Sequence, residues 1–151
     1  MTITHLLLDI EGTTCPVSFV SAVLFPYAKQ SLSSYLNDHQ EDSDLKSILQ
    51  AAEREWDGDS SPESINLRQA TRNQNLNFID SIKVYFEHLI NVDRKSTALK
   101  DLQGKIWDNG YRKGDITSHL FNETTECLKR WHRRRLSLSV YSSGSIQAQK
   151  L

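Results

Sequence analysis

The sequence has few of the residues that mark several protein classes. Only Cys15 and Cys127 are cysteines, too few for a disulfide scaffold and without the paired spacing of a zinc site, so we expect both to be reduced. Eighteen basic and nineteen acidic residues leave a net charge of −1, with no global field to attract a polyanion. We therefore expect neither nucleic acid nor membrane as a partner.

Long hydrophobic runs are missing as well. The first residues hold only the short apolar run Leu6-Leu7-Leu8, too short for export or membrane insertion, which predicts a cytoplasmic protein. The 38% of hydrophobic and 25% of charged residues are typical of a soluble, folded chain rather than a disordered one. We expect a monomer that acts on a small molecule.

Two strands are predicted, each followed by polar residues. Residues 3–10 are predicted to form a buried strand, because the compact apolar run Leu6-Leu7-Leu8 ends at the segment Asp9-Ile10-Glu11-Gly12. Residues 136–141 alternate and are rich in strand-forming residue types, and Ser142-Ser143-Gly144-Ser145 closes this second strand. A further helix is predicted to begin at Ile146.

The chain between the strands is predicted to be helical. Apolar residues recur at helical intervals over residues 17–36, where Pro26 is expected to break or bend the run into two helical pieces, and again over 45–56, 65–70, 78–90 and 98–107. A turn is expected between Gly110 and Gly114, followed by an amphipathic helix over residues 121–135. This order predicts an α/β protein in which a helical cap is inserted after the first strand of a parallel sheet.

The predicted division is a core over residues 1–18, a helical cap over 19–117 and the continued core over 118–151.

Asp9 and Glu11 lie two residues apart beyond the first strand, so extended backbone aims both carboxylates to one side. One can attack phosphorus while the other shuttles a proton. Two anions facing a phosphate require a cation, and Mg²⁺ suits such oxygen ligands.

The second strand end offers groups that bind phosphate. Ser142 and Ser143 carry hydroxyls, and backbone amides around Gly144 precede a predicted helix N-terminus, which favours anions. Taken alone, an Asp-x-Glu pair is usually solvated or caps a helix, and a Ser-Ser-Gly-Ser segment is usually a turn. Their joint position after apolar strands favours phosphoryl transfer at the edge of a sheet.

Several segments resemble one known family. Leu6-Leu7-Leu8-Asp9-Ile10-Glu11-Gly12-Thr13-Thr14 resembles the first motif of the haloacid dehalogenase superfamily, in the Asp-x-Glu-Gly-Thr-Thr form of the enolase-phosphatase (acireductone synthase) family. Further resemblance to that family lies in Pro16-Val17-Ser18-Phe19-Val20, Leu24-Phe25-Pro26-Tyr27-Ala28, Trp107-Asp108-Asn109-Gly110-Tyr111, Val140-Tyr141-Ser142-Ser143-Gly144-Ser145 and Ala148-Gln149-Lys150-Leu151.

The resemblance implies a haloacid-dehalogenase-like, doubly wound parallel core with an inserted all-helical cap. It implies that Asp9 is the nucleophile and a Mg²⁺ ligand, and that Glu11 acts near the metal and as acid/base. Ser142, Ser143 and Gly144 would hold the phosphate. The implied reaction converts 2,3-diketo-5-methylthiopentyl-1-phosphate, a small phosphorylated diketone, to the acireductone in methionine salvage.

The chain departs from the family pattern at its end. Family members continue to a phosphate-binding lysine and a later acidic motif, and Lys150 follows the serine loop too closely to be that lysine. We therefore expect an incomplete core and a chain that is an N-terminal portion. Two alternatives stay open: an inactive remnant or phosphate- and magnesium-binding module, and a general sugar-phosphate phosphatase.

One basic segment admits two interpretations. Trp131-His132-Arg133-Arg134-Arg135 could indicate a nucleic-acid patch, but no spaced aromatics accompany the arginines and the protein is nearly neutral. A solvated helix end is the favoured interpretation, because cations are stabilised at a helix C-terminus.

Overall fold

The computed structural model describes residues 3–142, which form a helix-rich α/β protein with a small parallel sheet. The chain divides into two compact units, one made of Met1–Pro26 with Trp107–Leu151 and the other of Tyr27–Ile106. The predicted cap of residues 19–117 includes the second unit and extends beyond it on both sides. None of the helices within residues 3–142 combines the length and apolar character needed to span a bilayer.

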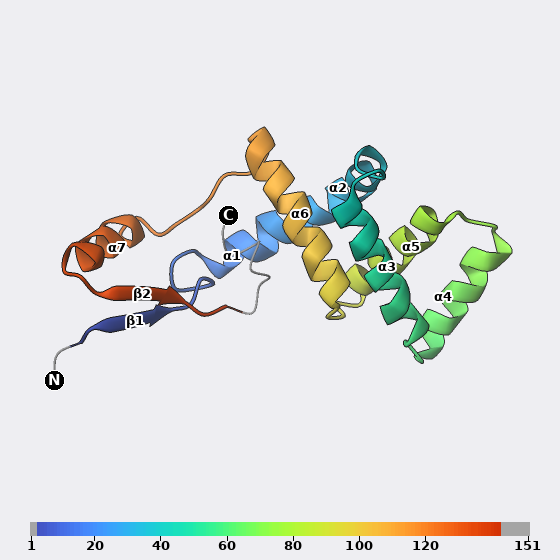
Figure 1. The fold of residues 1–151 in the computed structure, drawn as a ribbon, viewed down its shortest axis with the longest axis horizontal. Helices are drawn as coiled ribbons and strands as arrows, with labels where there is room; N and C mark the ends of the chain where they lie inside the picture. The colour runs from blue at the N-terminus through green and yellow to red at the C-terminus, as the bar shows by residue number, and fades with distance from the viewer. Residues whose placement is uncertain (1–2, 143–151) are drawn as a thin grey trace. The chain divides into compact units, whose positions relative to one another are not determined.

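The sheet of the first unit has two parallel strands, β1 (His5–Leu8) and β2 (Ser137–Val140), which lie side by side in Figure 1. The register pairs His5 with Ser137 and Leu8 with Val140. The pairing continues past both ends, since the Ser137 amide donates to the Thr4 carbonyl and the Tyr141 amide to the Leu8 carbonyl, each at 2.9 Å. Both predicted strands are confirmed, in shorter form.

Helix α7 (Thr124–Arg133) precedes β2 and packs against it (Figure 1). The helix ends at Arg133, and Arg135 just beyond it has a φ of 59°, the left-handed conformation common after a helix C-terminus. The Leu136 amide then donates to the Trp131 carbonyl at 3.2 Å, which satisfies one of the last helical carbonyls. The helix predicted over residues 121–135 is confirmed, although it begins three residues later.

Of the break or bend predicted at Pro26, the break does not occur. Helical residues run through α1 (Val17–Phe19), a π-helical turn η1 (Val20–Leu24) and α2 (Phe25–Asp38) without interruption. A π turn is wider than an α turn and gives the ring of Pro26 room against the preceding carbonyls. The Leu24 carbonyl in this segment accepts a hydrogen bond from the indole Nε1 of Trp107 at 2.7 Å.

The second unit is a helical bundle. It contains α3 (Ser43–Asp57), α4 (Pro62–Asn73) and α5 (Phe78–Asn91), together with most of α2 and the first part of α6 (Thr97–Lys113). The starts of α3 and α5 are capped by Asp42 and Asn77, whose side chains accept backbone amides. The largest fully buried side chains of its apolar core are Leu32, Leu36, Leu45, Leu49, Ile82, Phe86, Leu89, Leu102 and Ile106.

The helices predicted in this region are present, but α6 is longer than predicted. The turn expected at Gly110 is wrong, because the helix continues to Lys113 and ends at Gly114, which has a φ of 79°. A single glycine costs a helix only about 1 kcal/mol, so Gly110 does not stop it.

Buried polar contacts join helices that are far apart in the sequence. The Glu55 carboxylate on α3 accepts from the Ser96 hydroxyl and from the Ala98 amide at the start of α6. Asp59, after α3, pairs with Arg94, and its side chain is only 2% exposed. These contacts connect α3 with the chain between α5 and α6.

The charge of Asp59 is stabilised by its partners. Burial alone would raise the pKa of this carboxyl, but hydrogen bonds, led by that from the Ser61 amide and including that from Arg94, hold the pKa well below its usual value. Because its folded pKa is depressed, Asp59 contributes stability above the unfolded pKa of about 4. That contribution is lost as the pH falls below this value.

A tight turn follows β1. Gly12 has a φ of 74°, and its amide donates to the Cys15 carbonyl at 2.7 Å. A Cβ atom at Gly12 would lie 3.2 Å from Cγ2 of Val17. Glycine is therefore favoured here by both the backbone conformation and the space.

We predict that Asp59→Asn lowers the free energy of unfolding at pH 7 by about 2 kcal/mol, because a neutral amide replaces the buried carboxylate that pairs with Arg94 and accepts from the Ser61 amide. Urea unfolding followed by circular dichroism at pH 7 and pH 3 would measure this loss, which should shrink at pH 3. Asp101→Asn, at an exposed position, is the matched control and should be neutral. An equal loss at both pH values would contradict the role of the Asp59 charge.

We predict that Gly12→Ala destabilises the protein by about 1 to 2 kcal/mol, since an L side chain at positive φ is strained. Gly114→Ala is the matched control, because its φ of 79° carries the same backbone penalty while no atom lies within 4 Å of the added Cβ. The same unfolding measurement should show a larger loss for Gly12→Ala. Equal losses of stability in the two variants would mean that the Val17 side chain moves away from the added Cβ atom at no measurable cost.

Candidate functional site

The parallel register brings the two polar strand ends to one edge of the sheet. Leu8 pairs with Val140, and the residues that follow these two are Asp9 on the first strand and Tyr141 and Ser142 on the second. The hydrogen bond from the Tyr141 amide to the Leu8 carbonyl shows that this alignment persists beyond the strands. The loops after β1 and β2 therefore start side by side.

The two acidic residues of the first loop are exposed. The Oδ1 atom of Asp9 accepts from the Ile10 amide at 2.8 Å. Glu11 forms an isolated bridge to Cys15, which keeps its backbone in the turn. Both carboxylates are open to an incoming ligand.

One carbonyl organises this loop. The Ile10 carbonyl accepts from the amides of Thr13, Thr14 and Cys15 at 3.2, 2.9 and 3.2 Å. It also accepts from the Thr14 hydroxyl at 3.1 Å and from the Cys15 thiol at 3.6 Å. These contacts fold residues 10–15 around a single acceptor and hold the segment between Asp9 and Glu11 in place.

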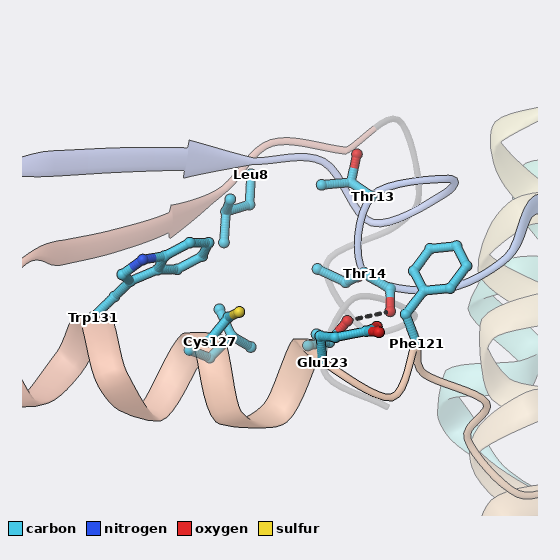
Figure 2. Close-up of a pocket in the computed structure, with 9 residues that line it drawn as sticks. Leu8, Thr13, Thr14, Phe121, Glu123, Cys127 and Trp131 are labelled. Carbon is cyan, nitrogen blue, oxygen red and sulfur yellow. Dashed lines mark hydrogen bonds between the residues drawn. The ribbon is translucent and has the colours of Figure 1, made fainter.

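A second carbonyl ties the loop to α7. The Thr14 carbonyl accepts from the Phe121 amide and from the Thr124 hydroxyl, both at 3.1 Å. Figure 2 shows the bond to Thr124 at the start of the helix. The acidic loop is thus fixed to the helix that leads into β2.

A cavity of about 250 Å³ lies between β1, this loop and α7 (Figure 2). The side chains of Leu8, Cys127 and Trp131 point toward one another across it. Its full lining is Leu8, Thr13, Thr14, Phe121, Glu123, Thr124, Cys127, Leu128 and Trp131. Asp9, Glu11 and Ser142 are not among these residues, so the cavity adjoins the candidate site without containing its charged groups.

Cys15 is buried behind the acidic loop. Burial raises the pKa of its thiol, and the negative charges of Glu11 and Asp9 raise it further. The thiol is therefore protonated at neutral pH and serves as a hydrogen-bond donor to the Ile10 carbonyl. This environment makes Cys15 a poor nucleophile and a packing residue of the loop.

Tyr111 lies close enough to Cys15 to interact with it electrostatically. Burial raises the pKa of the Tyr111 phenol, although a hydrogen bond with Ser118 acts in the opposite direction. Tyr111 belongs to one of the family-like segments, whereas no sequence pattern singles out Ser118. Their contact becomes apparent only when α6 and the chain after it are folded.

The residues offered for metal binding are carboxylates. Among residues 3–142 no group of three or more His, Cys, Asp or Glu side chains is placed to hold a metal ion. Asp9 and Glu11 nevertheless match Mg²⁺, which usually keeps several waters and takes one or two carboxylates with substrate phosphate. Ser142 is described and half-buried, while Ser143 and Gly144 lie outside the described residues.

Comparison with protein-family models gives no match. Comparison with curated proteins gives several named enolase-phosphatase E1. The chain is 92% identical to one from Parasynechococcus marenigrum over 151 residues, all of this chain and 62% of that protein. It is 54% identical to one from a Synechococcus species over 97% of this chain and 59% of that protein. It is 40% identical to one from Alcanivorax borkumensis over 99% of this chain and 59% of that protein.

A solved structure agrees with the fold. The UTR4 protein (Unknown transcript 4 protein) of Saccharomyces cerevisiae matches with a TM-score of 0.63 and 31% identity, over 99% of this chain and 55% of that one. The chain thus spans about three fifths of the length of the curated relatives it matches. Similarity of this extent along the whole chain identifies it as a member of the enolase-phosphatase family.

Proposed function

We propose that this chain forms the nucleophile-bearing part of a bifunctional enolase-phosphatase, which converts 2,3-diketo-5-methylthiopentyl-1-phosphate to the acireductone in methionine salvage. The main support is the parallel register, because it aligns the loop of Asp9 and Glu11 with the loop of Ser142. The name shared by the relatives supports the choice of reaction. We place this enzyme in the cytoplasm as a monomer.

The proposed architecture is a haloacid-dehalogenase-like, doubly wound core with an all-helical cap. The first unit, with its parallel strands and α7, would belong to the core, and the helical second unit would be the cap. In an open α/β sheet, ligands bind outside the carboxyl ends of the strands. Asp9 and Ser142 follow such ends.

Asp9 is the proposed nucleophile. One of its carboxylate oxygens attacks the phosphorus atom, and the bond from phosphorus to the leaving oxygen of the substrate breaks. The product is an aspartyl phosphate. Asp9 is exposed, and the Ile10 carbonyl fixes the loop that carries it. Both observations support this role, since a nucleophile has to be accessible and oriented.

Glu11 is the proposed acid and base. In its protonated form it gives its proton to the leaving oxygen, and the resulting carboxylate then takes a proton from water. The hydroxide formed attacks phosphorus, the bond to Asp9 breaks, and inorganic phosphate is released. Bound Mg²⁺, held by Asp9 and Glu11, would supply positive charge between these carboxylates and the phosphate.

Ser142, Ser143 and Gly144 are the proposed phosphate contacts. A serine hydroxyl can donate to a phosphate oxygen, and the position of Ser142 two residues after Val140, which pairs with Leu8, supports its nearness to the reacting group. No residue is assigned as the base for enolisation.

Asp9→Asn should lower turnover about 1000-fold or more in a protein that joins this chain to the remaining length of its relatives, because the amide is not nucleophilic. Release of inorganic phosphate from the diketone phosphate would measure the loss. Asp38→Asn, at another exposed position, is the control and should keep full turnover. Persistent phosphatase activity in Asp9→Asn would remove the nucleophile assignment.

The same assay separates the competing functions. A general sugar-phosphate phosphatase would cleave simple phosphate esters at least as fast as it forms acireductone, which is followed by its absorbance. An inactive binding module would show no turnover even with the unaltered sequence. Faster acireductone formation than simple-ester cleavage supports the proposed reaction.

Ser142→Ala should raise KM about tenfold, because the substrate loses one hydrogen bond to its anionic phosphate. The effect on kcat should be smaller. Ser139→Ala, on β2 and exposed, is the matched control and should leave KM unchanged. Steady-state kinetics with the same substrate would measure both variants. An unchanged KM for Ser142→Ala would remove this residue from the phosphate site.

A further inference from the structure

Positive charge is concentrated at the end of α7. Five of the eighteen basic residues lie within seven positions and form what we call the α7 basic face: Lys129, Arg130, Arg133, Arg134 and Arg135. The rest of the chain contains the other thirteen basic residues and all nineteen acidic residues, so its formal net charge is −6. The near-neutral total therefore conceals a strong asymmetry.

The α7 basic face is turned to solvent. Lys129, Arg130, Arg133 and Arg134 follow one another at helical neighbour spacing, and all five cations are exposed. The opposite side of the helix is apolar, since Cys127, Leu128 and Trp131 line the cavity beneath β1 (Figure 2). The orientation of α7 is set by this packing, which presents the cations outward.

Few of these charges are neutralised within the part of the chain that the structure describes. Lys129 pairs with Glu126 at 3.3 Å, and Arg130 donates to the Cys127 sulfur at 3.5 Å. None of the ion pairs found among residues 3–142 involves Arg130, Arg133, Arg134 or Arg135. Four guanidinium groups thus remain available for an anionic partner.

The helix dipole does not explain this number of cations. A helix C-terminus carries the equivalent of about half a negative charge, which one or two cations in the last turn already balance. The α7 basic face holds five positive charges against one paired glutamate. The excess charge favours a ligand with several negative groups.

We propose that the α7 basic face binds the phosphodiester backbone of nucleic acid without reading its sequence. Four of its five cations are arginines, whose planar forks match phosphate oxygens. Lys129 to Arg133 spans about 6 Å of helix, and Arg134 and Arg135 carry the charge past the helix end, enough for about three phosphates of one strand. This inference departs from the expectation drawn from the net charge of the whole chain.

A membrane fits these observations less well. Binding of an amphipathic helix in a bilayer interface uses an apolar face beside the cations. The apolar residues of α7 are engaged with β1 and the acidic loop, so they do not reach an outer surface together with the arginines. Contact with phosphates alone favours a polyanion in solution.

The test is binding of the full chain to a short fluorescently labelled DNA duplex, followed by anisotropy at increasing salt. About three phosphate contacts predict a slope of log K against log salt near −3, or a loss of about 40-fold between 50 and 200 mM salt. The triple variant Arg130→Gln, Arg133→Gln, Arg134→Gln should bind about tenfold or more weakly at 50 mM salt and should show a shallower slope.

The matched control is Arg72→Gln, Lys100→Gln, Lys113→Gln, which removes three exposed, unpaired cations elsewhere among the described residues and should bind as the unaltered chain does. Circular dichroism verifies that each variant is folded. A triple Arg→Lys variant at the same α7 positions keeps the charge. It replaces the glutamine variant in the test if that variant is unfolded. It should retain the salt slope with a smaller loss of affinity.

Three outcomes would overturn the proposal. Equal weakening by the α7 and control variants would mean that only overall charge matters. Binding that does not change with salt would exclude phosphate contacts. Binding to phosphatidylserine vesicles without binding to the duplex would replace nucleic acid by an acidic membrane.

Discussion

The parallel pairing of β1 with β2 is the contact on which the site depends. The two strands are separated by more than a hundred residues, and their register places Asp9 and Tyr141 directly after the paired residues Leu8 and Val140. A slip of one residue would turn every side chain of one strand to the other face of the sheet. The amide of Tyr141 extends the pairing by one bond, to the point where the polar loops begin.

The acidic loop is held by backbone acceptors rather than by side-chain pairs. The Ile10 carbonyl gathers the amides of residues 13–15, and the Thr14 carbonyl connects the loop to Phe121 and Thr124. Asp9 and Glu11 are therefore positioned without being consumed by ion pairs. Exposed carboxylates on a fixed backbone are suited to a proposed nucleophile and proton carrier, because ordering costs are met before substrate binds.

The second unit is stabilised by its own contacts. Its apolar core lies among α2, α3, α5 and α6, and the pairs of Glu55 with Ser96 and of Asp59 with Arg94 join segments far apart in the chain. The chain outside the α7 basic face has a formal net charge of −6, whereas the five cations of that face lie close together and are exposed. The net charge of the whole chain therefore does not reveal the local excess of positive charge at the end of α7.

The sequence by itself determined the two strands, most of the helices and the candidate residues Asp9, Glu11 and Ser142, because apolar periodicity and motif residues are local properties. It did not determine the passage of the helix through Pro26, which depends on a π turn, nor the extension of α6 past Gly110. Only the tertiary structure decided the strand register, the contact of Tyr111 with Ser118 and the outward orientation of the α7 arginines. These features arise from packing between segments distant in sequence, which a linear pattern does not encode.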